Sequence, residues 1–229
     1  MDPLDNPVWH ALAGPQRELA MVRGRAARYL VEVAPFAALP DVLEPEAWDE
    51  LRSLVGPGGI AVLAREAIVP PLGWRALFRM PTAQMIAPPD FTTARSPSAD
   101  VAIEALGPRD VPEMLALVAR TAPGPFAERT IELGTYLGVR HAGTLIAMAG
   151  ERIRLAGHTE LSAVCTDAEH RGRGLASALM RAVATGVVAR GEMPFLHVVT
   201  DNTSAIRLYE TLGFTTRRVG EVVGLRAPE

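Results

Sequence analysis

A glycine-rich turn with the sequence Arg171-Gly172-Arg173-Gly174-Leu175-Ala176 lies between an apolar strand pattern and a long helix pattern. The first turn of a helix carries backbone N–H groups without intrahelical partners, and the positive end of the helix dipole lies behind them. Gly172 and Gly174 let the backbone approach an anion closely, and Arg171 and Arg173 add charge suited to phosphate. The turn therefore predicts a binding site for a pyrophosphate.

The residues around this turn exclude two common nucleotide-binding patterns. The Rossmann pattern G-x-G-x-x-G needs a third glycine, which the turn lacks at that spacing. The Walker pattern G-x-x-x-x-G-K-[ST] needs a lysine, and all 23 basic residues of the chain are arginine. The pyrophosphate must therefore belong to another kind of ligand.

The stretch from 195 to 214 adds a second motif. An apolar strand pattern at 195–200 leads into N-x-x-A-I-x-L-Y-E-x-L-G-F at 202–214. R-G-R-G-L-A resembles the R/Q-x-x-G-x-G/A loop of the GNAT superfamily of acetyl-CoA-dependent N-acetyltransferases, and the 202–214 run resembles its second motif. The resemblance covers roughly residues 101–226. Within the superfamily, the strand pattern at 159–166 most resembles the glycine N-acyltransferase-like branch.

The resemblance implies an α/β fold with a mixed, mainly antiparallel sheet flanked by helices. It also implies an N-acetyltransferase that moves an acetyl group from its co-substrate acetyl-CoA to a primary amine, by direct attack in a ternary complex and without a metal. The acceptor, a small-molecule or a peptide amine, is not identified by any contiguous run. Two alternatives stay open: a non-catalytic acyl-CoA-binding or regulatory module, and an N-acyltransferase that uses a longer acyl-CoA.

The resemblance also assigns residues to the acyl carrier. The end of the 159–166 strand is expected to pair through its backbone with the pantetheine arm and to polarise the thioester carbonyl. The turn supplies N–H groups to the pyrophosphate, and the second motif contacts the arm. The residues assigned in this way are Val164, Cys165, Thr166, Arg171, Gly172, Arg173, Gly174, Leu175, Ala176, Asn202 and Tyr209.

Tyr209 is also the predicted general acid. A phenol has an ordinary pKa near 10, so it carries a proton at neutral pH that it can give to the leaving thiolate. GNAT enzymes commonly place such a tyrosine at this position of the motif. The alternative is a packing role, because Ala205, Leu208, Tyr209 and Leu212 form one apolar stripe of a helix.

Glu160 is the first choice for the general base. It stands eleven residues before Arg171, the offset at which the histone acetyltransferase branch carries its catalytic glutamate. A carboxylate in a partly apolar cleft can have the raised pKa that a base needs. Glu151 and His197 are alternates, and an amine with a low pKa needs no strong base.

Composition places the chain among ordinary globular proteins. It has 229 residues, 48% of them hydrophobic, and a formal charge of −3, which argues against a nucleic-acid partner. Its acidic, proline-containing first residues do not suit a signal peptide, and no apolar run is long enough to cross a membrane, so a cytoplasmic location is expected. The single cysteine, Cys165, fits a reducing compartment and is interpreted as a buried thiol rather than an acetyl-accepting nucleophile.

A Pro/Ser/Thr-rich stretch at 87–98 predicts a boundary between an N-terminal α/β region, 1–95, and a GNAT domain, 96–229. The first region could be a degenerate copy of the same fold, a lid or a dimerisation module, and a homodimer is compatible with the sequence. The patterns predict helices at 6–20 (broken near Gly14-Pro15), 44–55, 110–121, 175–190 and from 202, and strands at 28–33, 60–64, 75–80, 101–106, 136–140, 144–154, 159–166, 195–200 and 215–223.

The acceptor cleft is expected to be built by the loop at 123–136 together with N-terminal additions. Glu128, Glu132 and Tyr136 lie in this loop, and carboxylates there would suit an ammonium group. The same residues could equally form an ordinary solvated turn.

Overall fold

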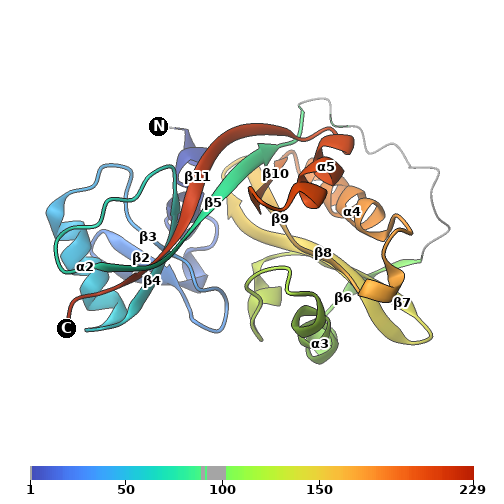
Figure 1. Cartoon of the computed structure of the whole chain (residues 1–229), viewed down its shortest axis with the longest axis horizontal. Coiled ribbons are helices and arrows are strands. Elements are labelled where there is room, and N and C mark those ends of the chain that lie inside the picture. Colours follow the sequence, from blue (N-terminus) through green and yellow to red (C-terminus); the bar gives the residue numbers. More distant parts are fainter. Residues whose placement is uncertain (1, 89–90, 92–101) are drawn as a thin grey trace.

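A mixed sheet in the order β4-β11-β5-β10-β9-β8-β7-β6 runs through the computed structural model, which describes residues 2–88, 91 and 102–229 (Figure 1). Most of the predicted linker lies outside the described residues. The strands are β4 (Ile60–Arg65), β5 (Arg75–Ile86), β6 (Ile103–Leu106), β7 (Tyr136–His141), β8 (Thr144–Leu155), β9 (His158–Thr166), β10 (Met193–Val199) and β11 (Thr215–Arg226).

A smaller antiparallel sheet and the helices cover this large sheet. The small sheet has the order β1-β2-β3, with strands β1 (Ala20–Arg23), β2 (Ala26–Tyr29) and β3 (Ala37–Ala38). The α-helices are α1 (Pro7–Leu12), α2 (Pro45–Val55), α3 (Val111–Thr121), α4 (Leu175–Ala189) and α5 (Thr203–Thr211). Short 3₁₀ helices are η1 (Pro3–Asp5), η2 (Arg17–Leu19), η3 (Pro108–Asp110), η4 (Thr130–Leu133) and η5 (Ala168–His170).

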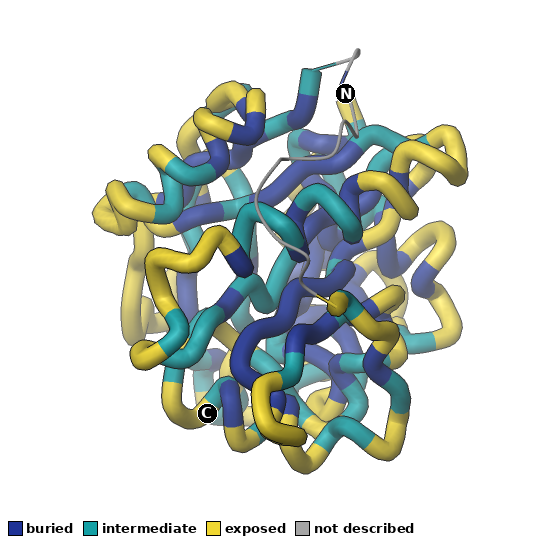
Figure 2. Tube along the Cα trace, turned by 90° about the vertical axis from the view of Figure 1, so that its right-hand side faces the viewer, coloured by how far each residue is buried: buried dark blue, intermediate teal, exposed yellow. Residues whose placement is uncertain are grey.

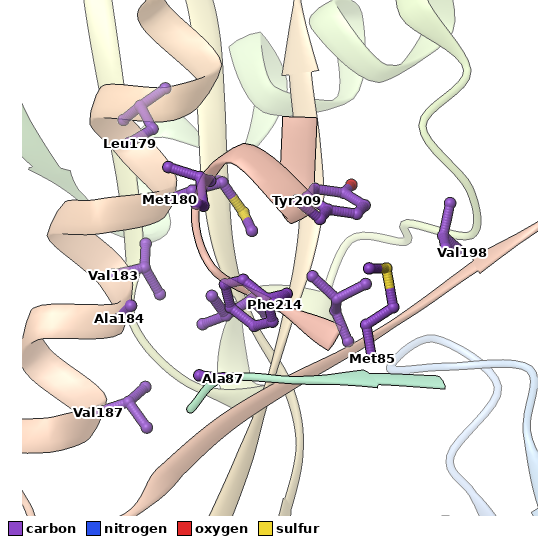
Figure 3. Packing of buried hydrophobic residues seen from close by; sticks show 14 of the residues in the cluster. Met85, Ala87, Leu179, Met180, Val183, Ala184, Val187, Val198, Tyr209 and Phe214 are labelled. Atoms are coloured by element: carbon purple, nitrogen blue, oxygen red, sulfur yellow. The ribbon is translucent and has the colours of Figure 1, made fainter. Parts of the chain in front are cut away.

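The two faces of β10 belong to different hydrophobic cores. Leu196 and Val198 point into a core formed with α4 and α5, whose buried stripe includes Leu179 and Val183 (Figure 3). Phe195 points into a second core, which contains residues of α1 and of the small sheet. Figure 2 shows buried stretches gathered through the middle of the molecule and exposed stretches in the outer loops. The alternation of side chains along a strand explains this two-sided burial.

The predicted fold class is confirmed: the sheet is mixed and mainly antiparallel, with the parallel pair β9–β10 at its centre. Two local predictions were right in kind but wrong in extent. The first helix ends at Leu12, and the strand predicted at 28–33 ends at Tyr29 because the chain turns there, with the Val33 N–H donating to the Leu30 carbonyl.

Strand β5 comes from the N-terminal segment but lies between β10 and β11. It pairs antiparallel with both, through the register pairs Thr82↔Val199 to Ile86↔Phe195 and Arg75↔Arg226 to Ile86↔Thr215. In Figure 1, β5 and β11 run side by side from one half of the molecule to the other. Strands from both sides of residue 95 therefore share one sheet, and the division into two domains stays a prediction.

The position of β5 allows a test of whether residues 96–229 fold as a separate domain. The fragment 96–229 lacks β5, so β10 and β11 lose their shared partner and Met85 leaves the core, where it is fully buried. We expect this fragment to show no cooperative thermal transition by calorimetry, and a peptide of residues 75–88 to restore one. Cooperative unfolding of the fragment alone would instead support two independent domains.

Candidate active site

Strands β9 and β10 pair only at their first residues. The register pairs are Met193↔His158, Pro194↔Thr159 and Phe195↔Glu160, and beyond Glu160 the two parallel strands part. Past this point β10 pairs with β5 on its other side, and β9 pairs with β8. The edge of β9 that faces the opening therefore has backbone groups free to bind an extended ligand.

A β-bulge shapes this free edge. The pairing of β8 with β9 jumps from Met148↔Cys165 to Gly150↔Ser162, so β9 carries one extra residue. Within the bulge, Ala163 has φ +53°, which an alanine adopts at an energetic cost. The bulge takes Ala163 and Val164 out of the regular ladder, next to the opening.

The predicted phosphate turn closes one end of the opening. Gly172 and Gly174 have φ +75° and +74°, the left-handed conformation that favours glycine. Gly174 is the N-cap of α4, and no side chain in the described part of the chain caps this helix. The first N–H groups of α4 are therefore available to an anion, as the sequence predicted.

Most of the predicted carrier-binding residues line a cleft with a volume of about 570 Å³. The predicted residues that line it are Val164, Cys165, Thr166, Arg171, Gly172, Gly174, Leu175, Ala176, Asn202 and Tyr209. Arg173 lies within the turn but is exposed and does not belong to this lining. Six further lining residues were not predicted from the sequence, namely Thr121, His170, Ser177, Ser204, Ala205 and Leu208. Their signals were weak: Ser204, Ala205 and Leu208 fall within the second motif, and His170 and Ser177 flank the turn, but nothing in the sequence indicated Thr121.

Tyr209 reaches the cleft from α5. Asn202 caps this helix by accepting a hydrogen bond from the Ala205 N–H (3.2 Å). The Tyr209 ring packs in the core beside Phe214, and its hydroxyl points away from Met180 and Phe214 (Figure 3). Burial raises the pKa of Tyr209 to about 12, so the phenol keeps its proton across the neutral range.

Cys165 lines the same cleft, but its thiol is poorly suited to attack a thioester. Burial raises the pKa of Cys165, and a thiolate is the reactive form of cysteine. This environment agrees with the interpretation of Cys165 as a buried thiol.

Glu160 lies at the point where β9 and β10 part, and its carboxylate is fully buried. Arg152 donates two hydrogen bonds to it (2.7 and 2.8 Å), and His197 Nδ1 lies 2.7 Å from Oε1. Burial by itself would raise the pKa of Glu160, but the Arg152 guanidinium and the His197 ring lower it to about 2. So weak a base accepts a proton poorly near neutral pH, and these surroundings count against Glu160 as the general base.

The other two candidate bases differ in their access to solvent. Glu151 is buried and pairs with Arg190 (2.9 Å). The His197 side chain keeps 16% of its surface exposed. Its ring lies edge-on against Phe195, with 5.8 Å between the ring centroids, on the face of β10 opposite Tyr209.

The residues expected to line an acceptor cleft lie in different surroundings. Glu128 is exposed. Glu132 is paired with Arg129 at the surface (2.6 Å). Tyr136 is buried against Phe126, and its hydroxyl has no partner among the described residues. The loop docks onto the N-terminal segment, because Thr130 Oγ1 donates to the Val33 carbonyl (2.7 Å).

Two other kinds of feature are missing from the described residues. They hold no group of three or more His, Cys, Asp and Glu side chains placed to bind a metal ion. They also hold no helix that is long and apolar enough to cross a membrane.

Comparisons with known proteins place this geometry in a family. A crystal structure from Novosphingobium aromaticivorans, assigned to the GNAT family of acetyltransferases, is 44% identical and covers 100% of both chains with a TM-score of 0.89. The chain belongs to the GNAT family. Its residues 136–223 also match the family described as FR47-like protein. These matches give no support to the narrower glycine N-acyltransferase-like branch.

The matches to two curated relatives cover only about half of each relative. The N-alpha-acetyltransferase RimI of Mycobacterium tuberculosis is 38% identical over 90 residues, which are 37% of this chain and 53% of RimI. An uncharacterised protein of Mycobacterium leprae is 32% identical over 184 residues, which are 74% of this chain and 46% of the relative. The GNAT chain thus spans about half the length of the curated relatives it matches.

The ion pair of Glu160 predicts a pH-dependent loss of stability. In the unfolded chain Glu160 has an ordinary pKa of 4.5, and in the folded chain about 2. Its contribution is therefore complete above pH 4.5 and is lost as the pH falls towards 2. We expect Glu160→Gln to lower the free energy of unfolding by about 3–5 kcal/mol at neutral pH, because it leaves Arg152 buried without a counter-charge.

Denaturant unfolding at several pH values measures this loss. The difference between wild type and Glu160→Gln should shrink as the pH falls. Glu104→Gln is a control, since Glu104 pairs with Arg140 at the surface and we expect a change below about 1 kcal/mol. A Glu160→Gln protein as stable as this control at neutral pH would contradict the prediction.

Proposed function

We propose that this protein is an N-acetyltransferase that transfers the acetyl group of acetyl-CoA to a primary amine by direct attack in a ternary complex. The observation that carries the proposal is the cleft of about 570 Å³, because one cavity joins the phosphate turn, the free edge of β9 and Tyr209. An extended carrier with a pyrophosphate at one end and a thioester at the other fits this arrangement.

The polar groups of the cleft suit coenzyme A. The uncapped N-terminus of α4 and the glycine turn offer backbone donors to the pyrophosphate. The free edge of β9 at Val164–Thr166 offers backbone partners to the pantetheine amides. Thr166 Oγ1 and His170 Nδ1, in residues that line this cleft, are buried without hydrogen-bond partners among the described residues. Unsatisfied polar atoms of this kind are expected where a polar ligand binds.

Tyr209 is proposed to stabilise the thiolate as it leaves. With a pKa of about 12, the phenol holds its proton more tightly than an ordinary thiol, whose pKa is about 8.5. Complete proton transfer to sulfur is therefore unfavourable in this environment, whereas a hydrogen bond from the phenol to the developing thiolate is favourable. We assign that hydrogen bond to Tyr209 as its contribution to the reaction.

Among the three candidate bases, we propose His197. Glu160 binds its Nδ1. The other two candidates are buried and each forms an ion pair with an arginine, whereas the His197 side chain is partly exposed and has no arginine partner among the described residues. His197 and Tyr209 lie on opposite faces of β10, so the amine can approach from one side of the opening while the thiolate leaves towards the other. In this scheme Glu160 positions the imidazole and stabilises the charge that the ring acquires.

A peptide α-amine is the acceptor class to test first, because the relative from Mycobacterium tuberculosis is described as an N-alpha-acetyltransferase. Small-molecule amines remain the second class. For the acyl donor, a longer acyl-CoA remains an alternative to acetyl-CoA. A non-catalytic acyl-CoA-binding module would need the phosphate turn but neither Tyr209 nor His197.

Ligand binding at the phosphate turn can be tested with two matched glycines. Gly172 and Gly191 both have positive φ and open space around the position of an added Cβ, but Gly172 lines the cleft and Gly191 follows the far end of α4. Gly172→Ala and Gly191→Ala should each lower stability by roughly 1 kcal/mol. Only Gly172→Ala should weaken acetyl-CoA binding, by about tenfold or more.

Thermal shift and calorimetric titration with acetyl-CoA, NAD and ATP measure this binding. Acetyl-CoA should raise the melting temperature of the wild type and of Gly191→Ala, while NAD and ATP should leave it unchanged. A wild-type protein that acetyl-CoA does not stabilise would overturn the proposed function.

Tyr209→Phe separates the enzyme from the binding module. Removing the hydroxyl should lower turnover about a hundredfold or more, while coenzyme A affinity and the melting temperature stay close to wild type. Because the pKa of Tyr209 is about 12, wild-type activity should show no alkaline loss from this residue up to about pH 11. The measurement is thiol release from acetyl-CoA with a pool of peptides that have free N-termini. Undiminished turnover in Tyr209→Phe would remove Tyr209 from the mechanism.

A further inference from the structure

Gln84 lies beside His197 although it comes from the N-terminal segment and belongs to neither motif. It is a buried residue of β5, paired in the ladder with His197 of β10. Its side-chain amide has three partners: Arg217, the carbonyl of Leu4 and the ring of His197. No motif or spacing in the sequence points to this amide.

Two of these partners fix the orientation of the amide. A guanidinium can only donate, so Arg217 Nη1 marks its partner, 2.9 Å away, as the amide oxygen of Gln84. A backbone carbonyl can only accept, so the Leu4 oxygen marks its partner, 2.7 Å away, as the amide nitrogen. The two constraints agree, and neither depends on the state of His197.

The orientation of Gln84 then determines which ring nitrogen of His197 carries the proton. The amide nitrogen of Gln84 lies 3.2 Å from His197 Nε2, and it can only donate there. His197 Nε2 must therefore accept, with its lone pair towards Gln84. The proton of the neutral ring lies on Nδ1, which donates to Glu160 Oε1 at 2.7 Å.

We propose that Gln84 is a positioning residue that holds His197 in the Nδ1–H tautomer, with Nε2 as its basic atom. The proposal rests on the proposed function in its assignment of His197 as the base, but the tautomer itself does not depend on any activity. A ring with its proton on Nε2 could not accept the proton of an attacking amine at that atom. Gln84 thus selects the form of the imidazole that is competent as a base.

The surroundings of the pair allow Nε2 to be released. The contact between Gln84 and His197 is the longest of the three that Gln84 makes. Both residues line a small cavity of about 20 Å³, which is room for one water molecule. Asp5 and Arg218 also line it and pair with each other at 3.1 Å, and Arg217 binds Asp5 as well as Gln84. A water molecule can replace the amide at Nε2 without disturbing the bond to Glu160.

Nitrogen NMR of histidine-labelled protein tests the tautomer directly, with His197→Asn used to assign the signals. In the full-length wild type near neutral pH we expect His197 to show a protonated Nδ1 and an unprotonated Nε2. Gln84→Glu replaces the donor with an acceptor, so it should favour a proton on Nε2 and give a ring with both nitrogens protonated. Gln84→Met removes the donor to Nε2 while Glu160 still accepts from Nδ1, so the Nδ1–H form should persist and only the Nε2 signal should shift, through loss of that hydrogen bond.

Thr82→Val is the matched control, because Thr82 lies two residues away on the same face of β5 and lines the same cavity. Its His197 signals should match those of wild type. An Nε2–H tautomer in wild type, or His197 signals that do not change in folded Gln84→Glu, would overturn the proposal.

A kinetic measurement separates this proposal from the proposed function. The pH dependence of thiol release from acetyl-CoA with the peptide pool should move to higher pH in Gln84→Glu and not in Thr82→Val. If His197→Asn keeps wild-type turnover while the tautomer results hold, the base assignment fails and the role of Gln84 becomes that of fixing a structural histidine.

Discussion

The parting of two parallel strands determines most of what this fold can do. Up to Glu160, β9 and β10 satisfy each other's backbone groups, and beyond it each has an edge that the sheet leaves open between them. Buried backbone groups without partners are unfavourable, so such an opening is stable only where water or a ligand can complete it. The bulge in β9, the uncapped start of α4 and the ring of Tyr209 all border this one gap.

A cluster of charges lies where the strands separate. The Arg152 side chain lies 5.0 Å from the ring centre of Phe36 and donates twice to Glu160, which also holds His197. Burying this ion pair has a large desolvation cost, so the pair gains little stability over packed apolar side chains, although removing one partner alone is costly. Its evident effect is geometric, since it fixes a carboxylate and an imidazole at the point where the sheet opens. The N-terminal segment completes the cluster through Gln84.

The parts of the site that depend on short-range sequence were predictable. The turn at 171–176 and the cap at Asn202 follow from local backbone chemistry, and both lie at the cleft. The surroundings of Glu160 were not predictable, because the spacing that singled it out contains no information about its partner. Arg152 lies across the hairpin from Glu160, and two irregularities in the β8–β9 register decide which residues face each other.

Long-range strand order was equally beyond the sequence. The pattern at 75–80 indicates a strand, yet nothing in it shows that β5 inserts between β10 and β11. That pairing joins segments far apart in the chain, and it brings Gln84 next to His197. A prediction built on consecutive elements pairs strands that are neighbours in sequence, so it could not place this amide in the site.

Ala163 has a consequence for the thermodynamics of ligand capture. Glycine would adopt its φ of +53° without steric cost, but glycine would also leave the bulge free to sample other shapes. With alanine the folded chain is strained by about 1–2 kcal/mol at this residue, and the shape of the bulge is fixed before any ligand arrives. Less conformational entropy then remains to be lost when an extended molecule lies along β9. The strain at Ala163 thus lowers the stability of the folded chain but increases its affinity for a ligand along β9.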